Sequence, residues 1–68
     1  MLQGAAPWPT KFGAVLAASG MTVDELAGLI DSDKWLIQHH LWGQHTPRAA
    51  TIARYCLALG CEPEDIIE

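Results

Sequence analysis

The chain has 68 residues, half of them apolar, and carries eight acidic against four basic side chains, for a formal net charge of −4. This length fits one domain, and the apolar content excludes an intrinsically disordered chain. No apolar run approaches the roughly 18 residues of a membrane span, and residues 1–9 lack the basic start and apolar core of a secretory signal. We therefore expect a cytoplasmic protein that has no membrane partner.

The first residues differ in composition from the rest of the chain. Residues 1–9 contain Gly4, Pro7 and Pro9, which predicts an irregular lead-in to a domain spanning residues 10–68. No alternation of apolar and polar residues in that domain is long enough to indicate a strand, so helix is the expected element throughout.

Two helices are expected in the first half of the domain. The first covers about residues 10–19 and ends at Gly20. The residues on its apolar face are Phe12, Val15 and Leu16. The second covers about residues 22–30, because Thr22 and Glu25 have the spacing of a capping box, in which each side chain satisfies a free backbone amide of the first turn.

The stretch DKWLIQHHLWG predicts a third helix over about residues 33–42, with Asp33 or Ser32 as its N-cap. At about 100° per residue, one stripe of this helix is aromatic and hydrogen-bonding. Its members are Trp35, Gln38, His39 and Trp42. Ile37 and Leu41 lie roughly opposite, so the helix is expected to pack one face on the core and to present the other to a partner.

A capping residue followed by proline, Thr46-Pro47, predicts the start of a fourth helix over about residues 47–59, with Gly60 as its end. Glu62-Pro63 opens a short fifth element. Five helices, the second and third separated by a turn of about three residues, predict a compact all-α domain that contains a helix-turn-helix unit.

Apolar spacing also predicts which side chains form the core. The expected core residues on the second, third and fourth helices are Leu26, Ile30, Ile37, Leu41, Ile52, Cys56 and Leu59. His40 is expected at the boundary of this core, with its ring packed and one nitrogen in water.

The residue types that carry metal or catalytic chemistry are poorly arranged for it. Three histidines and two cysteines are present, but they form no C-x-x-C or H-x-x-x-H pair, so we predict neither a metal site nor a cofactor. The chain has no nucleophile with a plausible base and no glycine-rich phosphate loop, and it is too short for a sizeable pocket. We expect a protein that is not an enzyme.

Basic residues are concentrated in the middle of the chain. Residues 34–61 hold Lys34, Arg48 and Arg54 together with all three histidines and no acidic residue. Residues 1–33 carry four acidic side chains, and residues 62–68 carry four more without a basic one. This asymmetry favours an anion-facing surface in the middle segment, despite the negative net charge.

Several motifs at fixed separations carry a family resemblance. They are GMTVDELA at residues 20–27, Ile37 and Gly43 in and after the third helix, Pro47, and LALGCEPEDII at residues 57–67. Through them, the chain from Gly20 to Ile67 resembles the Cro and phage-repressor family of helix-turn-helix DNA-binding domains, which have the lambda-repressor-like fold. The resemblance implies that the third helix is a recognition helix that lies in the major groove of double-stranded DNA.

The resemblance also implies which residues contact DNA. Lys34, Trp35, Gln38 and His39 would face base edges or nearby phosphates, and Trp42, Gln44, His45, Thr46 and Arg48 would lie near the backbone. By their chemistry, Gln38 can bind adenine through both ends of its amide, His39 can donate to guanine, and Trp35 can pack against thymine methyl groups.

Two functions remain open on this evidence. The first is a small sequence-specific transcriptional regulator of Cro or repressor type, of phage or mobile-element origin, acting as a homodimer on two half-sites of an operator. The second is an antirepressor-like protein-interaction module with the same fold, which uses Trp35 and Trp42 as anchors. The basic middle segment favours DNA as the partner, and the aromatic stripe and acidic net charge favour a protein partner.

Overall fold

The computed structural model describes residues 8–67, and every element in that part of the chain is helical. In chain order these are α1 (Lys11–Ser19), α2 (Val23–Ile30), α3 (Lys34–Leu41), α4 (Ala49–Leu59) and the 3₁₀ turn η1 (Pro63–Asp65). The all-α class is confirmed. Of the expected irregular lead-in, residues 1–7 lie outside the described part.

The prediction of a fifth helix is wrong, because the last element is a single 3₁₀ turn. The Asp65 carboxylate accepts a hydrogen bond from the Glu62 backbone N–H at 2.9 Å, which closes the segment on itself after one turn. Ile66 then enters the core, and Lys11 Nζ donates to the Glu64 carbonyl at 2.8 Å, which ties η1 to α1. The fold therefore has four α-helices and one short turn among its described residues.

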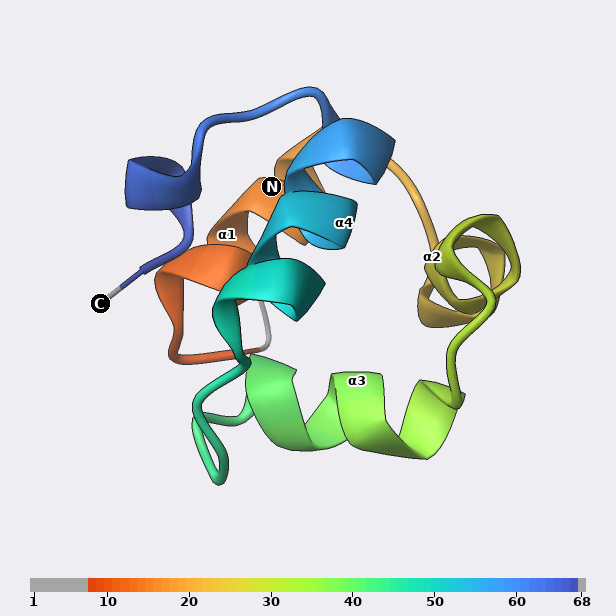
Figure 1. Ribbon diagram of the computed structural model, residues 1–68, viewed down its shortest axis with the longest axis horizontal. Helices are drawn as coiled ribbons and strands as arrows, with labels where there is room; N and C mark the ends of the chain where they lie inside the picture. Colours follow the sequence, from red (N-terminus) through yellow and green to blue (C-terminus); the bar gives the residue numbers. More distant parts are fainter. Residues whose placement is uncertain (1–7, 68) are drawn as a thin grey trace, which may run out of the picture.

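The α3 helix forms one side of the molecule, and α1, α2 and α4 lie on its inner side (Figure 1). The α2 helix is seen nearly end-on in this view while α3 lies across it, so the two helices cross steeply. They are joined by a turn of Asp31, Ser32 and Asp33, in which Asp31 takes the left-handed conformation at φ 54° and ends α2. This arrangement is a helix-turn-helix unit whose second helix has an outward face.

The α1 and α2 helices meet at a sharp corner. Gly20 ends α1 at φ 74°, a left-handed conformation that glycine adopts without steric cost. Among the described residues, no single helix has the length and apolar character needed to cross a membrane. The α1 and α2 helices would meet these two requirements only as a pair, and the pair is bent by 97°.

Hydroxyl and carboxylate caps fix the starts of the first three helices. The Thr10 hydroxyl accepts from the Gly13 N–H at 3.0 Å and donates to the Leu41 carbonyl at 2.6 Å, so it caps α1 and also joins it to the end of α3. The capping box of α2 is present, with Thr22 Oγ1 3.1 Å from the Glu25 nitrogen and Glu25 Oε1 2.8 Å from the Thr22 nitrogen.

The predicted start of α4 is wrong. The helix begins at Ala49, Arg48 is its N-cap without a side-chain cap, and Thr46 and Pro47 belong to the preceding loop. Pro47 is half-buried and lines a cavity of about 180 Å³ together with Phe12 and other apolar side chains. We attribute the late start to the half-buried position of Pro47, which keeps the loop extended past the proline.

We expect replacement of Thr22 by alanine to lower the free energy of unfolding by about 1 kcal/mol, because it removes one half of the capping box. The matched control is Thr46→Ala, which removes the same hydroxyl outside any helix and should change stability by less than about 0.5 kcal/mol. Urea unfolding followed by circular dichroism measures both. Equal losses would mean that Thr46 caps α4 after all.

The core is formed by one inward face of each helix and by Ile66. Its buried apolar residues are Phe12, Leu16, Leu26, Ile30, Ile37, Leu41, Ile52, Tyr55 and Ile66. The expected core residues Cys56 and Leu59 pack against it but are only half-buried. Tyr55 is fully buried and stacks on Phe12 with ring centroids 4.3 Å apart, which places an aromatic pair between α4 and α1.

His40 packs its ring against the core, as expected of a boundary histidine, and one of its nitrogens has a partner that the sequence does not indicate. His40 is buried at 6% exposure, and its Nδ1 lies 2.6 Å from the Tyr55 hydroxyl. Burial first, and then the charges of His45 and His39, lower the pKa of His40, while burial raises the pKa of Tyr55 to about 12. Both groups are therefore neutral near pH 7 and form a hydrogen bond between α3 and α4 inside the core.

The buried histidine predicts a pH dependence of stability. Because the pKa of His40 is lower in the folded than in the unfolded chain, the unfolded chain binds the proton more readily below about pH 6.5. The contribution of His40 is complete above that pH and is lost as the pH falls. We expect the free energy of unfolding to decrease between pH 7.5 and about 5.5, measured by urea unfolding.

Two variants identify the group responsible. His40→Gln should be less stable at pH 7.5 but should lose most of the pH dependence, whereas His45→Gln, which changes an exposed histidine, should keep most of it. A parent chain whose stability is constant over this range would contradict the prediction.

Candidate nucleic-acid interface

The outward face of α3 is the exposed stripe that the sequence indicates. Ile37, His40 and Leu41 are buried on the inner face of the helix. Trp35 is 68% exposed and Trp42 49% exposed, although large aromatic side chains are usually covered in a monomeric domain. Gln38 and His39 lie half-buried on the same stripe. The helix therefore offers a partner two indoles, an amide and an imidazole.

Three rings of this region form a series in which the His39 ring contacts the other two. The Trp35 and His39 rings are 4.2 Å apart at their centroids and inclined by 45°, and the His39 and His45 rings are 5.1 Å apart and inclined by 23°. We call these three residues the ring stack. It runs from the first turn of α3 to the loop between α3 and α4. It therefore connects the predicted base-facing residues of the helix with a predicted backbone contact of the loop.

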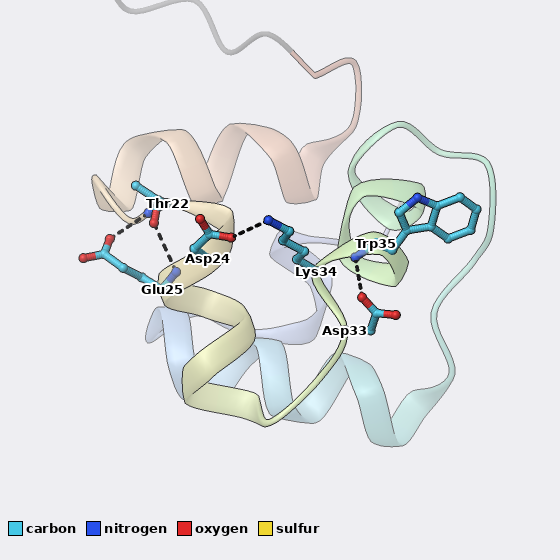
Figure 2. Close-up of polar contacts among 6 residues, drawn as sticks. All are labelled: Thr22, Asp24, Glu25, Asp33, Lys34 and Trp35. Atoms are coloured by element: carbon cyan, nitrogen blue, oxygen red, sulfur yellow. Dashed lines mark hydrogen bonds and ion pairs between the residues drawn. The ribbon is translucent and has the colours of Figure 1, made fainter.

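Two acidic side chains contact the first residues of α3, as Figure 2 shows. Asp33 Oδ1 accepts from the Trp35 backbone N–H at 2.9 Å and caps the helix. Lys34 Nζ lies 3.4 Å from Asp24 Oδ1 on α2, and the Lys34 side chain extends toward α2 while the Trp35 indole extends away from it. Both members of the ion pair are largely exposed, so the pair contributes little stability and leaves Lys34 free to exchange partners.

The loop after α3 carries the remaining predicted contacts. Gly43 takes a left-handed conformation at φ 77°, which turns the chain away from α3. The side chains of Gln44, His45, Thr46 and Arg48 are all exposed. Since no side chain caps α4, the free amides of its first turn are available to an anion beside Arg48.

The structure brings together only part of the predicted set. Trp35, His39 and His45 share the ring stack, and Lys34, Trp35 and Gln38 line a shallow hollow between α3 and the start of α2. Within residues 8–67, no hydrogen bond, ion pair or ring contact joins the side chain of Trp42, Gln44, Thr46 or Arg48 to these residues.

Two residues that affect this surface were missed by reasoning from sequence. One is Asp24, whose position in the first turn of α2 gives no indication that it reaches Lys34. The other is Tyr55, which fixes His40 beneath the outward face of α3. Both interactions join different helices, so only the fold reveals them.

The described residues offer little for metal or thiol chemistry. No group of three or more histidine, cysteine, aspartate or glutamate side chains in that range is placed to hold a metal ion. Cys56 and Cys61 are free and half-buried. Burial, followed by the interaction with Cys56 and nearby carboxylates, raises the pKa of Cys61 to about 11, so its reactive thiolate is scarce near neutral pH.

A family model described as a Cro/C1-type helix-turn-helix DNA-binding domain matches residues 11–68 of the chain. The match takes in all four helices and every residue of the outward face of α3. Comparisons with curated proteins and with solved structures give no significant match. The chain thus belongs to the family of Cro/C1-type helix-turn-helix DNA-binding domains.

Proposed function

We propose that the chain is a cytoplasmic, sequence-specific transcriptional regulator of Cro or repressor type, of phage or mobile-element origin, whose α3 helix reads the major groove of operator DNA. The observation that carries this proposal is the outward face of α3, where Trp35, Gln38 and His39 are accessible while the opposite face is buried in the core. An α-helix with such a face fits the major groove, where base edges differ in their donors and acceptors.

The surrounding residues supply contacts to phosphate. Arg48 and the free first-turn amides of α4 lie at the end of the loop, and Gln44, His45 and Thr46 are exposed along it. Lys34 lies at the other end of α3 and would exchange its contact with Asp24 for a phosphate. These contacts would fix the position of α3 but would carry no sequence information. Trp42 would extend the same surface at the end of the helix.

Dimerisation would compensate for the small number of basic residues. Phosphate contacts supply most of the non-specific affinity of a DNA-binding protein, and this surface has only Lys34 and Arg48 as permanent cations. We therefore propose a homodimer that places two α3 helices in successive major grooves, about one helical turn apart.

A second function is favoured by one specific observation. Trp35, Leu36 and Trp42 are all exposed on α3, and an exposed apolar group of this kind often marks a protein interface. In this alternative the domain is an antirepressor-like interaction module. Trp35→Ala would then abolish a protein complex and leave binding to DNA unchanged.

Selection from random duplexes, followed by a salt series on the enriched and on unselected DNA, tests the proposal. If the protein is a regulator, the selection should enrich one site, and the protein should bind that site more tightly than unselected DNA at every salt concentration. If no site is enriched and no duplex is bound at low salt, the regulator proposal fails and the protein-interaction alternative remains.

We expect Arg48→Ala to weaken binding to all duplexes by a similar factor and to lower the salt slope, the dependence of log K on log salt concentration, by about one. The reason is that Arg48 would neutralise one phosphate without contacting a base. Arg54→Ala is the matched control, because Arg54 lies on α4 with its guanidinium directed to the Ile30 carbonyl at 3.5 Å. An unchanged slope for Arg48→Ala would exclude it from the phosphate contacts.

A further inference from the structure

The outward face of α3 has few hydrogen-bonding groups available for base edges. His39 Nδ1 is buried and has no hydrogen-bond partner among the described residues, so only the other ring nitrogen of His39 is left to a base. Lys34 extends toward Asp24, and Asp33 is engaged as the N-cap of the helix. Gln38 is then the one side chain of this face that can both donate and accept. The most exposed large apolar side chains here are the indoles of Trp35 and Trp42.

The rings of this face also contact one another in the absence of a partner. The Trp35 backbone is fixed by Asp33, its ring contacts His39 one turn later, and His39 contacts His45 in the loop. Figure 2 shows that the indole is directed away from α2 and lies clear of the Lys34–Asp24 pair. Ordered rings lose little conformational freedom on binding, which favours recognition by shape and apolar contact.

The major groove presents one apolar group that such rings can recognise. This group is the methyl on C5 of thymine, and the same position of cytosine carries a methyl when that base is modified. The Trp35 indole, which is 68% exposed, has one N–H and is otherwise apolar, so it suits this methyl group better than the hydrogen-bonding atoms of a base edge.

We propose that the ring stack of Trp35, His39 and His45 reads 5-methylpyrimidines, so that specificity depends on methyl groups in the groove as well as on the amide of Gln38. This inference rests on the proposed function, since it requires α3 to enter the major groove. The group that the rings would recognise is the 5-methyl group of a pyrimidine, which either thymine or 5-methylcytosine supplies.

The experiment uses the full chain and a duplex enriched by selection. Each thymine of that duplex is replaced in turn by deoxyuridine, which removes only the methyl group and keeps every hydrogen-bonding atom. We expect one or two positions at which this change weakens binding about fourfold, the factor that corresponds to withdrawing one methyl-sized apolar group from contact. In a second series, the thymine at each of those positions is replaced by cytosine or by 5-methylcytosine, and the duplex with 5-methylcytosine should bind more tightly than the one with cytosine by a similar factor.

A protein variant links the effect to the ring stack. In Trp35→Ala, thymine and deoxyuridine should bind almost equally at the sensitive positions, because the ring that contacts the methyl is gone. Leu57→Ala removes an exposed apolar side chain from α4, far along the chain from the stack, and should keep the discrimination of the parent. Circular dichroism verifies that both variants fold, as their exposed positions predict.

The outcomes separate the inference from the function on which it rests. Equal binding of thymine and deoxyuridine at every position of a tightly bound site would overturn the methyl reading and leave the regulator proposal standing. Discrimination that persists in Trp35→Ala would overturn the role of the stack. Absence of binding to any duplex, together with a protein complex that Trp35→Ala abolishes, would overturn both proposals.

Discussion

Replacing Leu41 by alanine should lower the free energy of unfolding by about 2–5 kcal/mol, the range for truncating a fully buried leucine. Leu41 is 0% exposed, lies on the inner face of α3 and belongs to the core, so the truncation removes buried apolar surface and leaves a cavity. A small domain has a total stability of about 5–15 kcal/mol, with short chains at the lower end. Thermal unfolding followed by circular dichroism should show a midpoint lower by at least about 10 °C.

Leu57→Ala is the control for this prediction. Leu57 is 87% exposed on α4, so the same change of side chain should alter stability by less than about 0.5 kcal/mol. Similar losses in the two variants would mean that α3 is not packed on the core through Leu41. That result would also remove the basis for assigning the opposite face of α3 to a partner.

Replacing Gln38 by alanine should weaken binding to the preferred site by about 1–3 kcal/mol, while affinity for unselected DNA stays nearly unchanged. Gln38 lies at the centre of the outward stripe, and its side-chain amide makes no hydrogen bond within residues 8–67, so both of its ends are available to one base. Competition binding with the selected duplex and with random duplexes measures the two affinities.

Gln44→Ala provides the matched amide deletion. Gln44 is exposed in the loop after α3, where we expect it to contact the DNA backbone. Its loss should therefore weaken binding to selected and to random duplexes by the same factor. If Gln38→Ala behaves in this way too, Gln38 contacts phosphate and is not a base-reading residue.

The parts of the fold that the sequence predicted well are those set by local interactions. Thr22 and Glu25 are three residues apart and satisfy each other's backbone amides without help from the rest of the chain. Gly20 and Gly60 end their helices at positive φ, as glycine permits. The periodicity of α3 likewise separated its buried from its exposed face, because 3.6 residues per turn fix that division.

The wrong predictions concern residues whose conformation depends on distant parts of the chain. Thr46-Pro47 has the composition of a helix start, but Pro47 lies half-buried in the loop, and the helix begins only at Ala49. The hydrogen bond between His40 and Tyr55 was likewise not predicted, because the two residues are fifteen positions apart and lie on different helices. No local pattern predicts such contacts.

The candidate site was predicted as a list of residues and not as a geometry. Helical spacing places Trp35 and His39 on the same side of α3, so their contact follows from the sequence. The addition of His45 depends on the path of the loop, and the direction of Lys34 depends on Asp24 in another helix. DNA contact by any of these residues stays a prediction, because the fold fixes their positions and not their partner.

The positions of the tryptophans allow intrinsic fluorescence to report on the surface of α3. Two of the three indoles, Trp35 and Trp42, lie outside the core, and the third, Trp8, is half-buried beside it. Intrinsic fluorescence is therefore sensitive to what covers α3. Emission can follow docking in real time without an attached dye, and it can distinguish a bare surface from an occupied one.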